Sequence, residues 1–201
     1  MYVLHKRGIN TKLWKLVKEL NSNLLTTIQT KYGPTKKIQI TDSIRQGGVL
    51  SVTMYALMMD ETNKALKETD LGVEIPNSDV KIPCLLWMDD VVLADTTPAN
   101  SQKQLDITND TSLKYHVQYG MAKTKYLRTG KNKEEITLRL GNQTLEETEK
   151  YTYLGEINNK KMNLEEQIKA IEGKAEAAYQ TIIAVAEDRE FKNIKTHTIW
   201  T

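Results

Sequence analysis

The sequence has only one cysteine, Cys84, among its 201 residues. A single cysteine excludes an internal disulfide framework and any zinc site built from several cysteines. No apolar run approaches the roughly 20 residues that a membrane-spanning helix requires, and the first residues contain no apolar stretch of signal-peptide length. We therefore expect an intracellular protein, cytoplasmic or nuclear, that has no membrane partner.

Charge is unevenly distributed along the chain, although the net charge is only +2. Residues 1–41 contain eight lysines and arginines and one acid, Glu19, while residues 111–133 contain six basic residues and no acid. Clusters of positive charge favour a polyanionic partner such as nucleic acid. Charge alone leaves open the alternative of an unevenly charged, solvated surface.

The apolar pattern predicts helices and short strands in an α+β arrangement. Apolar residues recur every three or four positions in segments that we expect to be helical: 12–28, 51–66, 163–185 and, more weakly, 100–115. Asn163 and Glu166 form a variant of the capping box at the start of the last helix. Short strands are expected near residues 38–40, 72–75, 125–128, 136–140 and 151–154. A boundary near residues 158–163 separates a mixed body, 1–157, from a helical segment, 158–201.

Two adjacent acids, Asp89 and Asp90, interrupt an apolar stretch at residues 82–94. This pattern predicts a tight hairpin with the two carboxylates at its tip. Because neighbouring carboxylates repel each other, a bound cation explains them well, and hard oxygen ligands suit Mg²⁺. Two such ions could clamp the attacking and leaving oxygens of a phosphoryl transfer. The alternative is an ordinary turn, in which aspartate is common.

Five segments together resemble the reverse transcriptases of non-LTR (LINE-like) retrotransposons. The residues Ile-Arg-Gln-Gly-Gly-Val-Leu-Ser at 44–51 resemble the RQG.VLS signature, and residues 86–94 resemble the YADD hairpin of that family. The remaining three segments are Lys6–Ile9 with the helix after it, the lysine-bearing stretch 114–125, and the Tyr-Thr-Tyr-Leu-Gly at 151–155. Each motif is weak alone, but the five follow the family's order and spacing over nearly the whole chain.

The resemblance implies a fold and an activity. The fold would be a partial right-hand polymerase palm, an antiparallel sheet with packing helices, followed by a helical thumb segment. The activity would be RNA-directed DNA synthesis with Mg²⁺ or Mn²⁺, on an RNA template, a DNA primer and deoxynucleoside triphosphates. Asp89 would ligate the catalytic metal and Asp90 would support it, while Lys123 would lie near the departing pyrophosphate. Lys123 could equally be a solvated lysine in a basic strip.

The same resemblance implies a set of substrate-binding residues. Arg45, Gln46 and Gly47 would line the pocket for the incoming nucleotide and the template, where a glycine pair permits close backbone approach. Trp87 would stand where the primer end should lie, and Tyr153 and Gly155 would help to grip that end. The alternatives are an ordinary glycine turn for the first group and a plain edge strand for the last.

One element of the family pattern is missing from these 201 residues. The family's other metal-binding aspartate belongs to an upstream strand, and the chain begins after that point. We therefore expect little or no polymerisation by the chain alone. Departures at functional elements, including Gly48 and Trp87–Met88, indicate a truncated or decaying copy of a mobile element. Two alternatives stay open: a non-catalytic relic that only binds nucleic acid, and an unrelated α/β domain whose acidic hairpin is a turn.

Overall fold

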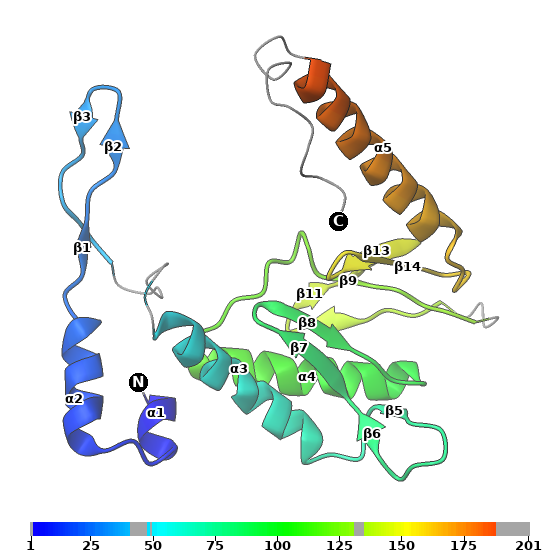
Figure 1. Cartoon of the computed structure of the whole chain (residues 1–201). Helices are drawn as coiled ribbons and strands as arrows, with labels where there is room; N and C mark the ends of the chain where they lie inside the picture. Colours follow the sequence, from blue (N-terminus) through cyan, green and yellow to red (C-terminus); the bar gives the residue numbers. More distant parts are fainter. Residues whose placement is uncertain (1, 41–47, 49, 131–134, 188–201) are drawn as a thin grey trace. The chain divides into compact units, whose positions relative to one another are not determined.

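A computed structural model describes residues 2–40, 48, 50–130 and 135–187 (Figure 1). The chain forms two compact units. The first unit consists of residues 1–123 and 136–145, and the second of residues 124–135 and 146–201. The buried apolar side chains of the described residues all belong to the first unit. In the described part of the chain, no helix has the length and apolar character needed to cross a membrane.

The first unit begins with two short helices and a long β-hairpin. The helices are α1 (Tyr2–Lys6) and α2 (Thr11–Leu20). The hairpin contains two nested antiparallel pairs, β1 (Leu25–Thr26) with β4 (Ile38–Gln39) and β2 (Gln29–Thr30) with β3 (Gly33–Pro34). The predicted helix over 12–28 is therefore wrong beyond residue 20. Asn21 caps α2 and Asn23 takes a left-handed φ of +54°, a conformation in which asparagine ends helices.

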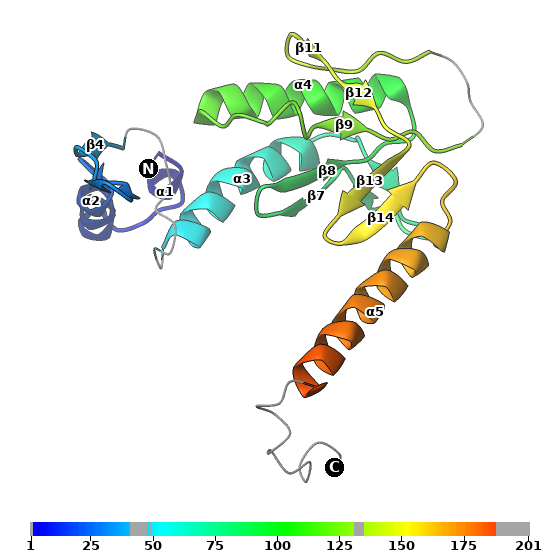
Figure 2. The same cartoon turned by 90° about the horizontal axis from the view of Figure 1, so that it is seen from above.

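Two long helices carry the core of the first unit. The helix α3 (Ser51–Lys67) matches the predicted 51–66 segment, and α4 (Pro98–Tyr115) is two residues longer at its start than predicted. The Thr97 side chain caps α4 by accepting a hydrogen bond from the Asn100 backbone N–H at 3.2 Å. The two helices pack against each other and against the hairpin β7 (Cys84–Trp87) and β8 (Asp90–Leu93) (Figure 2).

Two smaller hairpins complete the first unit. One pairs β5 (Val73–Glu74) with β6 (Lys81–Ile82), and the other pairs β10 (Arg139–Leu140) with β11 (Gln143–Thr144). The strands are shorter than the predicted 72–75 and 136–140. Gly72 precedes β5 with φ +118°, and a Cβ there would lie 2.5 Å from the Ile82 carbonyl carbon. Only glycine fits this close approach.

The second unit contains two strand pairs and a long helix. The strand β9 (Lys125–Tyr126) runs parallel to β12 (Glu146–Glu147), and β13 (Lys150–Tyr153) is antiparallel to β14 (Glu156–Asn159). The helix α5 spans Glu165–Glu187. With helices and small, mostly antiparallel sheets, the chain agrees with the predicted α+β class.

The predicted capping box at the start of α5 is wrong. The helix begins at Glu165, two residues after Asn163. The Asn163 side-chain oxygen accepts a hydrogen bond from Asn159 Nδ2 at 3.0 Å, and Glu166 forms an ion pair with Lys150 at 2.8 Å. Both partners lie outside the helix. Asn163 and Glu166 therefore bond to these residues instead of capping the helix, and the local sequence pattern does not predict such contacts.

Candidate active site

The acidic hairpin expected from the sequence is present, with both acids at its tip. Trp87 pairs with Asp90, so Met88 and Asp89 form a two-residue turn and Asp90 begins β8. Met88 takes a φ of +56°, which is unusual for a residue that carries a Cβ. The turn therefore places two consecutive carboxylates at the end of a stiff two-stranded element.

The tip is open to solvent. Asp89, Asp90 and Met88 are exposed, and 63% of Trp87 is accessible. Within the described part of the chain, neither carboxylate has a side-chain hydrogen bond or an ion pair. Both carboxylates are thus available to a ligand from outside these residues.

The helix α3 supplies a neighbour to the tip. Burial raises the pKa of the Tyr55 phenol, and the negative charge of Asp89 raises it further. The charge of Asp89 at the tip is thus felt by Tyr55, one turn into α3. The sequence did not indicate Tyr55 as a site residue, because the contact joins positions far apart in the chain.

Behind Tyr55, the packing between α3 and β7 holds polar groups with partners inside the protein. Burial raises the pKa of Tyr119, whose hydroxyl also interacts with Thr62. Cys84 is buried, its Sγ lies 3.6 Å from Asn63 Oδ1, and burial raises the pKa of its thiol. A buried thiol with a raised pKa is a packing group rather than a nucleophile.

The base of α3 is fixed by an ion-pair network that includes the Lys6-Arg7 pair of the first motif. Glu61, whose side chain is only 4% exposed, accepts hydrogen bonds from Lys6 Nζ at 2.8 Å, Arg7 Nη2 at 3.1 Å and the Tyr115 hydroxyl at 2.9 Å. Arg7 also donates to Asp60 at 2.7 Å. The hydrogen bond from Lys6 is the main reason that the pKa of Glu61 falls to about 2. This network joins α1, α3 and α4.

Three predicted nucleotide-binding residues, Arg45, Gln46 and Gly47, lie outside the described residues. The first described position after them is Gly48, whose carbonyl accepts a hydrogen bond from the Ser51 N–H at 3.0 Å. Gly48 therefore lies just before α3, the helix that carries Tyr55.

Lys123 lies in an exposed turn, where its backbone N–H donates to the Gly120 carbonyl at 2.9 Å. Its role near the departing pyrophosphate stays a prediction.

Tyr153 and Gly155 lie in the second unit. Tyr153 pairs with Glu156, so Leu154 and Gly155 form the turn, with φ values of +49° and +89°. Positive φ at both turn positions is the pattern of a type I′ hairpin. The predicted strand 151–154 therefore ends one residue early, and an exposed leucine occupies a left-handed position.

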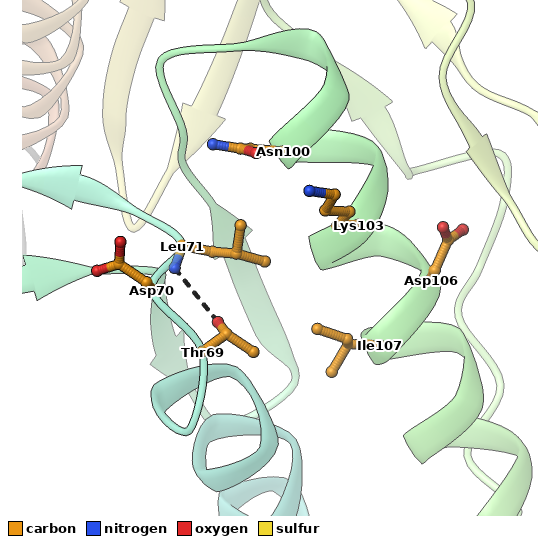
Figure 3. Close-up of a pocket in the computed structure, with 7 residues that line it drawn as sticks. All are labelled: Thr69, Asp70, Leu71, Asn100, Lys103, Asp106 and Ile107. Atoms are coloured by element: carbon orange, nitrogen blue, oxygen red, sulfur yellow. Dashed lines mark hydrogen bonds between the residues drawn. The ribbon is translucent and has the colours of Figure 1, made fainter.

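A separate pocket lies between the end of α3 and α4 (Figure 3). It is lined by Thr69, Asp70, Leu71, Asn100, Lys103, Asp106 and Ile107. None of the predicted site residues lines it, so it has no part in the active-site hypothesis.

The donor set at the hairpin tip fits half of a magnesium site. Mg²⁺ binds through one or two carboxylates together with substrate phosphates, and Asp89 and Asp90 supply two adjacent carboxylates without protein partners. Across the described residues, however, no group of three or more His, Cys, Asp or Glu side chains could hold a metal ion. A further ligand must come from outside this set.

Comparison with known proteins gives one match. The family model described as "Reverse transcriptase (RNA-dependent DNA polymerase)" matches residues 2–157, from α1 into β14. No curated protein matches the chain. The match spans most of the chain, and it contradicts the alternative of an unrelated α/β domain.

Proposed function

Because the chain belongs to the reverse transcriptase (RNA-dependent DNA polymerase) family, we propose that it is the core of a polymerase of the non-LTR retrotransposon (LINE-like) type. Its substrates would be an RNA template, a DNA primer and deoxynucleoside triphosphates. One observation carries the proposal: two adjacent carboxylates without protein partners stand at the tip of a fixed hairpin in the matched region.

In this proposal Asp89 and Asp90 hold Mg²⁺ or Mn²⁺, the ions that reverse transcriptases generally use. When bound, the ion would neutralise charge on the reacting phosphate oxygens. Asp89, in the turn, is the principal ligand, and Asp90, the first residue of β8, supports it.

The remaining residues are proposed to position the substrates. Arg45, Gln46 and Gly47 would contact the incoming nucleotide and the template. Lys123 would offset the negative charge that develops on the leaving pyrophosphate. Trp87, exposed beside Asp90 on the hairpin, would contact the primer end.

The hairpin β13–β14 and the helix α5 also have roles in the proposal. Tyr153 and Gly155, at the β13–β14 turn, would help to grip the primer end. Residues 1–157 would form a partial palm, and residues 158–201 a thumb-like segment, of which α5 is the described helix. Two carboxylates leave the site short of a ligand, so a third acidic group from outside the described residues would complete it.

Replacing Asp89 with Asn tests the metal role directly. We expect Asp89→Asn to weaken Mn²⁺ binding about tenfold or more, because the change removes the anionic ligand and keeps the shape. Mn²⁺ binding can be followed by water proton relaxation, with and without a deoxynucleoside triphosphate. Binding of a labelled RNA should be unchanged.

A matched control is Asp79→Asn, which removes an exposed acid from the β5–β6 loop. Equal Mn²⁺ affinities for the Asp89 and Asp79 variants would contradict the proposed site.

A second candidate is a non-catalytic relic that binds nucleic acid only. The shortage of carboxylates favours it. The Asp89 variant separates the two: a relic would show RNA binding and no specific Mn²⁺ site in the unaltered chain.

A further inference from the structure

A strongly basic surface is formed by α2 and the hairpin 24–40, here called the basic arm. All of its six lysines are exposed, and none of them has an ion pair within the described part of the chain. They are Lys12, Lys15, Lys18, Lys31, Lys36 and Lys37. Glu19 is the only acid between residues 11 and 37. The arm therefore carries positive charge that the described residues do not neutralise.

Three lysines in the second unit have ion-pair partners. Lys125 pairs with Glu146 at 2.9 Å, Lys150 with Glu166 at 2.8 Å, and Lys160 with Glu147 at 2.6 Å. Because those charges are matched locally, they are poorly placed to attract a polyanion. The lysines of the basic arm have no such competitors.

The tip of the arm presents an aromatic ring. Thr30 pairs with Gly33, so Lys31 and Tyr32 form a two-residue turn. The Thr30 hydroxyl donates to the Gly33 carbonyl at 2.8 Å and accepts from the Tyr32 N–H at 3.1 Å. These bonds fix the turn and leave Tyr32 88% exposed. A large ring held in water on a fixed turn has no packing role in the described structure.

The ring is also paired with a cation. Lys31 Nζ lies 4.9 Å from the centroid of the Tyr32 ring, within the range of a cation–π contact. A lysine beside an exposed tyrosine can bind a phosphate while the ring stacks on the neighbouring base. Stacking on aromatic side chains and phosphate contacts to lysine are the two features of single-strand recognition.

We propose that the basic arm binds an unpaired polynucleotide strand, with its lysines on the phosphates and the Tyr32 ring stacked on a base. This inference rests on the proposed function, because the strand would be a nucleic-acid substrate of the proposed polymerase. The basic arm and the acidic hairpin are separate segments of the sequence. An unpaired strand fits better than a duplex, because bases inside a duplex have no free face for a ring. The arm also exposes large apolar side chains, so binding to phospholipid vesicles is one of the outcomes tested below; they are Leu13, Leu16, Leu20, Leu25, Ile28 and Ile38.

Fluorescence anisotropy with the full chain tests the proposal. Labelled single-stranded RNA and DNA, each with an abasic counterpart of equal charge, are titrated in EDTA so that the metal site has no influence. Tyr32→Ala should weaken binding of the normal strands about tenfold and leave binding of the abasic strands unchanged. Tyr32→Phe should restore binding, because it keeps the ring.

The charge half of the proposal has its own test. Lys36→Ala with Lys37→Ala should lower the slope of log Kd against log salt by about 1.4, or about 0.7 for each lost phosphate contact. Lys161→Ala with Lys169→Ala, two exposed lysines near the start of α5, is the matched control and should change the slope much less.

The outcomes separate this inference from the proposed function. Strong binding that the arm variants and the control affect equally would overturn the inference and leave the polymerase proposal standing. No binding of either nucleic acid by the unaltered chain would overturn both. Equal loss of binding to anionic phospholipid vesicles and to normal strands in the arm variants would show a general anion surface instead.

Discussion

At the scale of single residues, three exposed apolar side chains in the described part of the chain hold left-handed backbone conformations: Met88, Leu154 and Met162. Met162 lies outside the segments that resemble polymerase motifs. Met88, with φ +56°, forms the turn of the acidic hairpin, and Leu154, with φ +49° and 54% exposed, forms the turn between β13 and β14. A left-handed φ costs a residue with a Cβ roughly 1–2 kcal/mol. Neither side chain recovers that cost by burial, and such strain gathers at functional sites. Both turns belong to segments that resemble polymerase motifs, which supports a functional reason for each.

Glu61 is the residue whose charge matters most for stability. Its side chain is 4% exposed and meets Lys6, Arg7 and Tyr115. Removing one partner from a buried ionic network leaves the other charges uncompensated, a loss of about 3 kcal/mol. We therefore expect Glu61→Gln to lower the free energy of unfolding at pH 7 by about 3 kcal/mol in denaturant titrations. Glu68→Gln, at an exposed carboxylate just after α3, should change it by less than about 0.5 kcal/mol.

The same carboxylate gives the pH dependence a definite sign. The pKa of Glu61 is lowered from 4.5 to about 2 in the folded chain, so its stabilisation is fully present above pH 4.5. It is lost as the pH falls from about 4.5 toward about 2, because the unfolded chain takes up the proton first. The difference in stability between the unaltered chain and Glu61→Gln should therefore shrink over that window. A constant difference would show that Glu61 acts through packing alone.

At the scale of elements, one buried amide ties α4 to the acidic hairpin. Gln104 is fully buried, and its Nε2 donates to the Pro83 carbonyl at 3.1 Å and to the Ala94 carbonyl at 3.0 Å. Those carbonyls stand at the open end of the β7–β8 pair, opposite the tip. The Pro83 carbonyl also accepts a hydrogen bond from the Ala94 N–H at 3.3 Å, whereas the Ala94 carbonyl accepts its hydrogen bond from Gln104.

Gln104→Met keeps the length of the side chain and removes both donors. The Pro83 carbonyl keeps its hydrogen bond from the Ala94 N–H, so the Ala94 carbonyl is the one that loses its donor. An unsatisfied buried carbonyl costs about 1–3 kcal/mol, and we expect a loss of that size. Hydrogen exchange of the hairpin amides should accelerate, because their anchor to α4 is gone. Gln118→Met, at an exposed position after α4, provides the comparison. Equal exchange in the two variants would mean that apolar packing alone holds the hairpin.

The elements also show where sequence periodicity was sufficient and where it failed. The helix 51–66 and the hairpin 82–94 were predicted from apolar spacing alone, because strong local patterns defined both. The segment 12–28 failed beyond residue 20, since its leucine spacing continued through asparagines that end helices. The segment 100–115 is predicted only weakly to be a helix, yet α4 spans 98–115. Thr111 and Ser112 fit into this helix because their hydroxyls donate hydrogen bonds to carbonyls within it, at 2.8 and 2.7 Å.

The candidate site divides in the same way. The sequence predicted the carboxylates at the tip, because an acid pair between two apolar runs is a local pattern. It missed Tyr55 and the Glu61 network, which depend on contacts between positions more than 30 residues apart. Long-range contacts of this kind follow from the packing of α3 against its neighbours, and the spacing of apolar residues does not predict them.

At the scale of the whole molecule, a net charge of +2 conceals a strong separation of charge. The basic arm has six exposed lysines and one acid, whereas acids concentrate after residue 133 and pair with lysines of the second unit. A polyanion would therefore be attracted to one part of the chain rather than to all of it. This separation lets nucleic-acid binding persist even where chemistry does not occur.

That separation leads to a prediction for the purified 201-residue chain. The described residues hold two adjacent carboxylates and no third ligand near them, and a phosphoryl-transfer site with two metals needs both ions clamped. We expect no more Mg²⁺-dependent primer extension from the chain than from its Asp89→Asn, Asp90→Asn double variant, while both bind the primed RNA template equally well. Primer extension resolved on a sequencing gel, with anisotropy on the same substrate, makes the comparison. Extension that the double variant cannot perform would mean that two carboxylates suffice, and that the missing upstream aspartate is replaced from within these residues.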